Sequence, residues 1–88
     1  MKTLKVGNKF KKDAAAAWKR GFDGSKLAAV VKLLCAGEPL PSRCRPHKLQ
    51  GDWKDYWECH IGPDWLLIYT FTDVEVVLHR TGTHSDLF

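Results

Sequence analysis

Two strongly apolar segments near the C-terminus constrain the fold more than any other feature of this sequence. They span residues 65–71 and 74–78, and only Thr72 and Asp73 separate them. Two apolar runs of this length joined by a two-residue polar link predict a β-hairpin. The first run is apolar on both of its faces, so we expect it to form a strand in the middle of a sheet.

Polar side chains gather at the two outer ends of this hairpin. His60 and Asp64 come before the first run, whereas Arg80 and His84 come after the second. When a hairpin folds back on itself, the start of its first strand and the end of its second strand lie side by side. The sequence therefore predicts a functional site at one end of the sheet, built from residues in loops and at strand ends.

The N-terminal part of the chain predicts one short strand and two amphipathic helices. Residues 2–6 alternate weakly and should form a strand at the edge of the sheet. Apolar residues then recur at helical spacing from Lys9 to Gly21, and again from Ser25, the expected N-cap of the second helix, to Gly37. Two helices joined by so short a link form a helical hairpin, and each must cover an apolar surface.

The central part of the chain predicts a long connection followed by one more strand. The three prolines of residues 38–46 favour an extended segment, residues 47–53 a loop, and residues 54–61 a strand. The order of elements predicts an α+β fold, with the helical hairpin packed on one face of a mostly antiparallel four-stranded sheet. A chain of 88 residues has room for one core, so we expect one domain over residues 1–88.

Composition excludes several classes of protein. At 44% hydrophobic and 27% charged residues, the chain is typical of a globular protein rather than a disordered one. No apolar run is long enough to cross a bilayer, and the N-terminus has no apolar signal segment, so we expect a cytoplasmic protein without membrane contacts. The three cysteines form no Cys-x-x-Cys pair, which predicts reduced thiols rather than disulfides or a zinc site.

The positive charge of the chain is concentrated near the N-terminus. The net charge is +4, and the first 20 residues hold seven Lys or Arg and only one Asp. A face of this kind attracts polyanions such as RNA, although a lysine-rich helix surface also serves simply to face solvent. The lysines expected to contact a polyanion are Lys9, Lys11 and Lys12.

Three of the four histidines lie outside any apolar pattern. His47, His60 and His84 fall in predicted loops or at strand ends, where a rigid scaffold presents functional groups. Such a set can bind a metal ion or transfer protons at a phosphodiester. Their spacing matches no recurring zinc motif, so a metal site is the weaker interpretation, and we expect neither a metal ion nor another cofactor.

Cleavage of RNA by its own 2′-hydroxyl explains more of these residues. The reaction needs a base for the 2′-proton, a cation for the extra negative charge and an acid for the departing 5′-oxygen. Histidine titrates near neutral pH, and arginine is a natural ligand of phosphate, which makes Arg80 a candidate for the cation. Trp65 and Phe88 are the best candidates for exposed aromatic rings that stack on an unpaired base.

Three strings in the C-terminal half, HKLQGDW, ECHIGPDWLLIY and RTGTHSDLF, resemble characteristic segments of the RelE/YafQ family of bacterial toxins. The resemblance covers essentially the whole chain and is closest from Pro46 to Phe88. It implies a RelE-like fold and a toxin of a type II toxin–antitoxin module that cuts messenger RNA on the translating ribosome. It also implies a cognate antitoxin, which wraps the toxin and through which the complex binds operator DNA.

The resemblance also implies roles for individual residues. The family pattern makes His84 the general acid, while Arg80 neutralises the phosphate and Trp65 and Phe88 hold the RNA. A carboxylate of ordinary pKa is a poor base for a hydroxyl, so Asp64 is expected to orient a histidine instead. The group that takes the 2′-proton stays open at this point. The remaining acid/base or substrate-orienting groups are His47, His60 and Asp64.

Two alternative functions are compatible with the same fold. A ParE-like toxin inhibits DNA gyrase by binding and is not a nuclease. A non-catalytic module that binds nucleic acid or protein is the second alternative. The three histidines favour the nuclease, because binding alone does not require groups that titrate near neutral pH.

Overall fold

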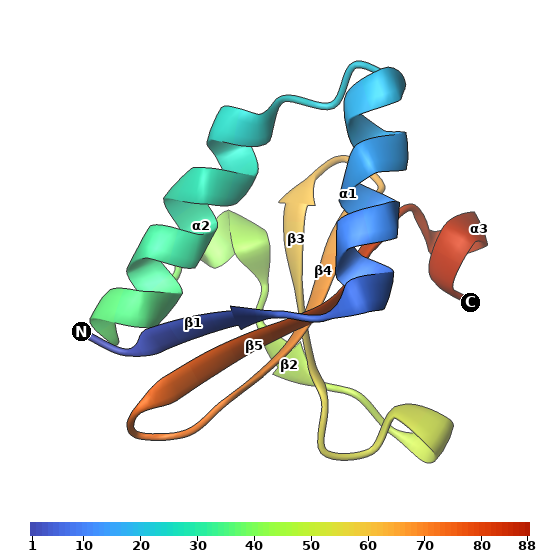
Figure 1. The fold of residues 1–88 in the computed structure, drawn as a ribbon. Helices are drawn as coiled ribbons and strands as arrows, with labels where there is room; N and C mark the ends of the chain where they lie inside the picture. Colours follow the sequence, from blue (N-terminus) through green and yellow to red (C-terminus); the bar gives the residue numbers. More distant parts are fainter.

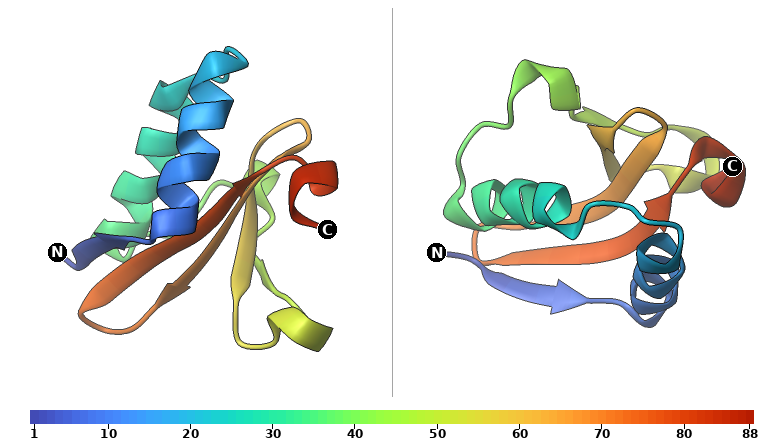
Figure 2. Two further views of the ribbon diagram at one scale, coloured as in Figure 1. Left: turned by 45° about the vertical axis from the view of Figure 1, so that its right-hand side comes forward. Right: turned by 90° about the horizontal axis from the view of Figure 1, so that it is seen from above.

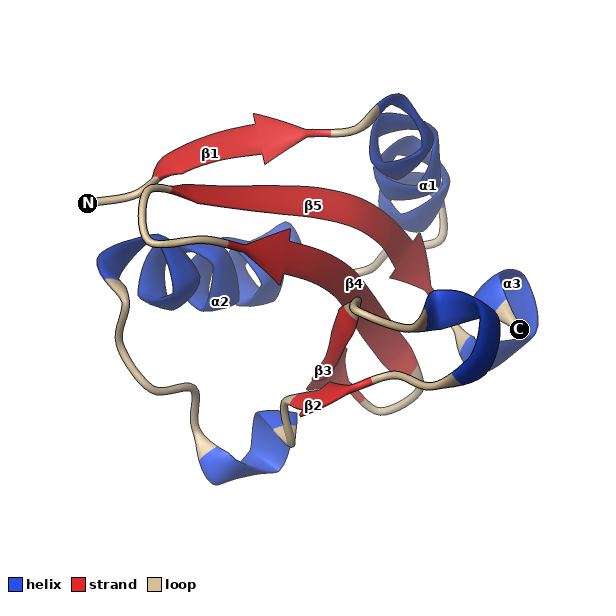
Figure 3. Ribbon diagram, turned by 90° about the horizontal axis from the view of Figure 1, so that it is seen from below, coloured by secondary structure: helices blue, strands red, loops and turns tan.

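The apolar hairpin forms the centre of a five-stranded sheet in the computed structural model, which describes residues 1–88 (Figure 1). The strands are β1 (Thr3–Val6), β2 (His47–Lys48), β3 (Trp57–Gly62), β4 (Trp65–Phe71) and β5 (Glu75–Gly82). Their order is β1-β5-β4-β3-β2, so β4 is the middle strand, as predicted (Figure 3). β1 pairs with β5 in parallel, and all other neighbouring strands are antiparallel.

Three α-helices and two short 3₁₀-helices complete the α+β fold. They are α1 (Asn8–Lys19), α2 (Gly24–Ala36), α3 (His84–Leu87), η1 (Ser42–Cys44) and η2 (Gly51–Trp53). The predicted helical hairpin is α1 and α2, and Gly37 ends α2 in the left-handed conformation with a φ of 71°. No helix combines the length and the apolar character that crossing a bilayer requires.

Four local predictions are wrong. Asp23 rather than Ser25 caps α2, because its Oδ1 accepts hydrogen bonds from the backbone N (2.9 Å) and Oγ (2.6 Å) of Ser25. The connection predicted as extended contains η1, and the predicted loop contains β2 and η2. The sheet consequently has five strands instead of the predicted four. The sequence does not reveal β2, because a strand of two residues shows no alternation.

The main hydrophobic core lies between the helical hairpin and one face of the sheet. Phe10 and Ala14 of α1 and Leu27 and Val30 of α2 are buried against it. Trp57, Cys59 and Ile61 alternate along β3, and all three belong to this cluster or pack on it. The strand residues buried in this core are Cys59, Ile61, Trp65, Leu67, Tyr69, Val76 and Leu78.

A second, smaller cluster lies on the opposite face of the same sheet. Leu66 and Ile68 of β4 point to this side and pack with Leu87 of α3. Leu49, Trp53 and Tyr56, in and around η2, cover them further. Figure 2 shows the helical hairpin and α3 on opposite sides of the sheet. This is why β4 is apolar on both faces, and it is this second face that carries the candidate site.

Candidate active site

The two ends of the hairpin meet as the sequence predicts. Leu66 pairs with Gly82, so the start of β4 lies beside the end of β5. Asp64, in the turn before β4, therefore lies next to His84, the first residue of α3. Its Oδ1 accepts hydrogen bonds from the backbone N (3.0 Å) and from the ring Nδ1 (2.8 Å) of His84.

These two hydrogen bonds define the states of Asp64 and His84. Donation from the backbone and the ring of His84 lowers the pKa of Asp64, so the group is a carboxylate near neutral pH. The carboxylate accepts from Nδ1–H of His84, which leaves Nε2 as the ring nitrogen available to a substrate. The His84 side chain is 58% exposed, so a substrate can reach this nitrogen.

The short helix α3 is fixed by a capping box and by an ion pair. The Thr83 hydroxyl accepts from the backbone N of Asp86 (3.2 Å), and Asp86 accepts from the backbone N of Thr83 (2.9 Å). Arg20, just beyond α1, donates to the same carboxylate at 2.8 Å. The backbone N–H of Thr83 and the Arg20 guanidinium lower the pKa of Asp86 to about 2. His84 is thus held by the main domain although it lies in a four-residue helix.

His60 lies across from His84, at the end of β3. The two ring centroids are 6.3 Å apart, so these histidines lie together at one end of the sheet. The pairing of β3 with β4 shifts register between His60 and Gly62, and such a bulge commonly re-aims a side chain next to an active site. Partial burial and the positive charge of Arg45 lower the pKa of His60, so the ring is neutral at pH 7.

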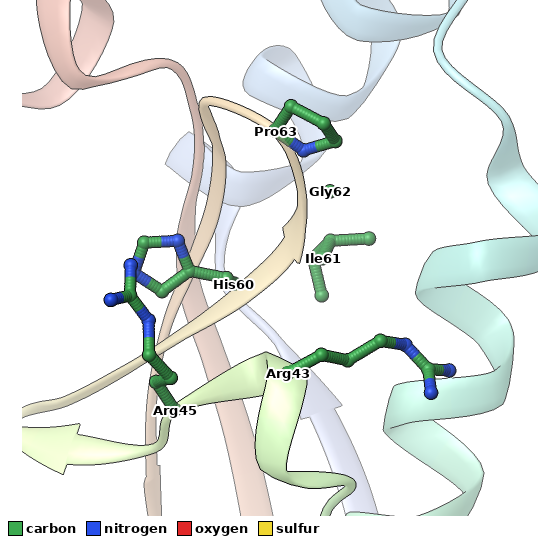
Figure 4. Close-up of a pocket in the computed structure, with 6 residues that line it drawn as sticks. All are labelled: Arg43, Arg45, His60, Ile61, Gly62 and Pro63. Atoms are coloured by element: carbon green, nitrogen blue, oxygen red, sulfur yellow. The ribbon is translucent and has the colours of Figure 1, made fainter.

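A pocket of about 310 Å³ opens beside His60 (Figure 4). Arg43 and Arg45 of the segment around η1 form one side of this pocket, and the end of β3 with Pro63 forms the other. In Figure 4 the guanidinium of Arg45 lies against the His60 ring, whereas that of Arg43 points toward α2. The pocket is therefore cationic next to a neutral histidine, which suits an anionic ligand.

His47 occupies β2, where it pairs with Glu58 of β3. Its Nδ1 lies 2.8 Å from the carbonyl oxygen of Arg45, and its Nε2 lies 3.4 Å from Oε1 of Glu58. Protein oxygens thus contact both ring nitrogens. Glu58 is only 5% exposed, so it is a buried carboxylate at the base of the site. The charges of His47 and Glu58 both reach His60 and affect its pKa.

Phe88 is the exposed aromatic ring of the site. Its side chain is 59% exposed, and its ring centroid lies 6.4 Å from that of His84 and 6.1 Å from that of Trp53. An exposed ring beside the candidate acid is well placed to stack on a base. The predicted exposure of Phe88 is confirmed.

The prediction that Trp65 is exposed is wrong. Trp65 is 5% exposed, and it lies on the face of β4 that the helices cover. Its ring packs against Trp18 and Phe22, at centroid distances of 6.3 and 5.0 Å, and its Nε1 donates to Oγ1 of Thr81. An indole held in the core on all sides has no free face for a base.

Arg80, the expected phosphate-binding cation, forms an ion pair within the protein. Its Nε donates to Oδ2 of Asp13 in α1 at 2.6 Å, and a second guanidinium nitrogen lies 3.2 Å from Oδ1. This ion pair raises the pKa of Arg80 and joins β5 to α1. Arg80 pairs with Ile68 of β4, so it starts from the face of the sheet that carries the site, but its charge is neutralised by Asp13. The unpaired cation beside His60 is Arg45, which the sequence analysis did not single out.

Two further features bear on substrate and metal binding. The three lysines expected to contact RNA lie exposed on α1, and this contact stays a prediction. They are Lys9, Lys11 and Lys12. No three His, Cys, Asp or Glu side chains lie close enough together to hold a metal ion, and the three cysteines are buried free thiols.

Comparison with known proteins identifies the family. A family model described as "Bacterial toxin of type II toxin-antitoxin system, YafQ" matches residues 2–88. The chain belongs to the YafQ toxin family. It is 42% identical over 86 residues to the mRNA interferase toxin YafQ of Escherichia coli K12, which covers 97% of this chain and 94% of that protein. Both the predicted resemblance and the RelE-like fold are confirmed.

Solved YafQ-family structures superpose closely on this chain. A copper-bound mutant toxin from Helicobacter pylori gives a TM-score of 0.94 with 42% identity, over 100% of both chains. The toxin of the E. coli DinJ-YafQ toxin-antitoxin complex gives a TM-score of 0.90 with 41% identity, over 99% of this chain and 97% of that one. The short elements that position the site therefore occur within a shared fold.

Proposed function

We propose that this chain is the toxin of a type II toxin–antitoxin module and acts as an endoribonuclease that cuts messenger RNA on the translating ribosome. The observation that carries the proposal is the meeting of His60 and His84, with ring centroids 6.3 Å apart and Asp64 bonded to His84. Two imidazoles at this separation can reach the same phosphate group. Support also comes from the mRNA interferase named among its relatives.

His60 is the proposed general base and His84 the general acid. Neutral His60 removes the proton from the 2′-hydroxyl, whose oxygen then forms a bond to the adjacent phosphorus. The bond from phosphorus to the 5′-oxygen breaks, and Nε2–H of protonated His84 gives its proton to that oxygen. The products are a 2′,3′-cyclic phosphate and a 5′-hydroxyl end. Each well-placed proton transfer typically contributes ~10²- to 10⁴-fold in rate.

Asp64 and His47 are proposed to position these two groups. The Asp64 carboxylate holds the His84 ring through Nδ1, which leaves Nε2 facing the substrate. His47 is held between the Arg45 carbonyl and Glu58, so it serves to shape the base side of the site rather than to transfer protons. Phe88 would stack on a base next to the cut, and the lysines of α1 would contact ribosomal RNA.

We propose that the cleavage is independent of a bound metal ion. The two histidines supply both proton transfers, and no three ligand side chains converge in the site. Toxin treated with a chelator and then desalted should cleave at the untreated rate in the same ribosomal buffer. A loss of activity that one added metal restores would contradict this part of the proposal.

The proposed partner is a cognate antitoxin. The relatives include the E. coli DinJ-YafQ toxin-antitoxin complex, in which the toxin chain matches this one over nearly its whole length. We propose that the antitoxin also connects the complex to operator DNA, and that toxin and antitoxin meet in the cytoplasm, where the ribosomal substrate is found.

Mapping of transcript 5′ ends tests the proposed activity. Brief expression of the wild-type chain should produce cuts in phase with codons and ends that carry a 5′-hydroxyl. His84→Gln should abolish these cuts without lowering Tm, because the His84 side chain is exposed. His79→Gln is the matched control, since His79 bonds to Thr70 within the sheet and lies outside the site. Toxicity that survives His84→Gln would favour binding to gyrase instead.

A further inference from the structure

We propose that Arg45, rather than Arg80, neutralises the scissile phosphate and stabilises the transition state of the proposed cleavage. This assignment rests on the proposed ribonuclease function and completes its site. The reaction needs a cation beside the phosphate, because the negative charge on the phosphate oxygens grows as the 2′-oxygen attacks. The charge of Arg80 is neutralised by its ion pair with Asp13, which favours a cation without an ionic partner for this role.

The surroundings of Arg45 satisfy the requirement. The side chain is exposed and takes part in none of the five ion pairs of the chain, and it lines the pocket of about 310 Å³ together with His60. Figure 4 shows its guanidinium lying alongside the His60 imidazole. When the 2′-hydroxyl of the substrate faces His60, the adjacent phosphate therefore lies next to the Arg45 guanidinium. The planar fork of arginine can donate to two phosphate oxygens at once.

The backbone of Arg45 supports a functional role. Its φ of 43° and ψ of 58° are left-handed, a conformation that residues with a side chain seldom adopt. A residue before proline normally favours extended backbone, and Pro46 follows. The same backbone geometry places the Arg45 carbonyl 2.8 Å from Nδ1 of His47. The chain thus uses one strained residue both to orient His47 and to deliver a cation to His60.

Arg43 provides an internal control. It lies two residues away, it lines the same pocket, and it carries the same charge, yet its guanidinium points toward α2 in Figure 4. A general attraction between RNA and a basic surface predicts similar effects of neutralising either arginine. A transition-state contact predicts an effect at Arg45 alone.

Single-turnover cleavage on programmed ribosomes tests the assignment. Arg45→Gln should slow cleavage by ~10²- to 10³-fold, comparable to the loss of one oxyanion donor in other enzymes. Arg45→Lys should recover part of this loss, and Arg43→Gln should cleave within a few-fold of wild type. Affinity for ribosomes that carry a non-cleavable 2′-O-methyl messenger should change much less than the rate in Arg45→Gln.

A titration by NMR reports on the same contact independently of activity. Arg45→Gln should raise the pKa of His60, because it removes a nearby positive charge. Arg43→Gln should leave the pKa of His60 unchanged. Three results would overturn the assignment: cleavage by Arg45→Gln close to the wild-type rate, equal losses in both glutamine variants, or a loss of affinity as large as the loss of rate. Failure of the wild-type chain to cleave would instead refute the proposed function itself, so the two failures are distinguishable.

Discussion

The buried hydroxyl of Thr81 gives a quantitative test of the finding that Trp65 belongs to the core. Thr81 is 1% exposed, accepts from Nε1 of Trp65 at 2.8 Å and donates to the carbonyl of Leu66 at 2.7 Å. Thr81→Val replaces the hydroxyl by a methyl group of nearly the same size. The substitution therefore leaves the packing in place and removes the only partner of a buried indole N–H.

The expected cost follows from the loss of that partner. A buried polar group without a hydrogen bond costs about 1–3 kcal/mol of unfolding free energy. In a domain of this size each kcal/mol lowers Tm by roughly 4–8 °C, so Thr81→Val should lower Tm by roughly 4–24 °C. Thermal unfolding followed by circular dichroism measures this shift. The cleavage rate per folded molecule should not change, because neither side chain faces the RNA.

A double-mutant cycle with Trp65→Phe isolates the hydrogen bond. Phenylalanine has no N–H, so Thr81→Val should cost less in the Trp65→Phe background than in the wild-type background. The coupling expected for two residues in direct contact is about 0.5–3 kcal/mol. Independent costs of the two substitutions would show that the bond contributes nothing. Trp65→Phe protein that is folded yet binds RNA more weakly would show that the indole does reach the substrate.

The remaining predictions concern two glycines, Phe88, His60 and the lysines of α1. Gly82→Ala places a Cβ 2.9 Å from Oδ2 of Asp86, so it should fray α3 and slow cleavage, as hydrogen exchange of the C-terminal amides and a cleavage assay would show. Gly37→Ala, also at positive φ but in open space, should cost about 1 kcal/mol and leave cleavage intact. Phe88→Ala should weaken binding of a single-stranded RNA, measured by fluorescence anisotropy, by ~1–3 kcal/mol without lowering Tm. The base must be neutral to act, so lowering of the His60 pKa should place the acidic limb of the pH–rate profile below the ordinary histidine value; a limb above that value would exclude His60 as the base. Charge reversal of the α1 lysines should weaken ribosome association and flatten its dependence on salt, whereas an unaltered salt slope would show that they only face solvent. The three reversed residues are Lys9, Lys11 and Lys12.

The sequence predicts the sheet, the helical hairpin and half of the site because these depend on local patterns. Alternation and helical spacing extend over whole elements, and the turn that carries Asp64 directly precedes the central strand. His60 and His84 flank the hairpin, so simple pairing of its strands brings them together. The two-residue β2 and the four-residue α3 escaped prediction, because neither contains enough residues to show a period.

The errors concern residues whose partners are distant in sequence. The first run of the hairpin is apolar throughout, so its pattern cannot tell whether Trp65 faces the helices or solvent. Asp13 and Arg80 are 67 residues apart, and nothing local to Arg80 reveals that its charge is neutralised. Arg45 becomes part of the site only because β2 pairs with β3 and because its own backbone is left-handed.

The division of the interior into two clusters of unequal size has a consequence for how this toxin loses activity. The main core contains thirteen buried residues, whereas the cluster under α3 contains three, and α3 is held otherwise by exposed polar contacts such as the Arg20–Asp86 ion pair. If this small cluster opened, α3 would move and carry His84, the proposed general acid, out of the site while the main core stayed folded. The C-terminal end is therefore the part of the chain where local unfolding, which costs less than global unfolding, removes the proposed acid from the site.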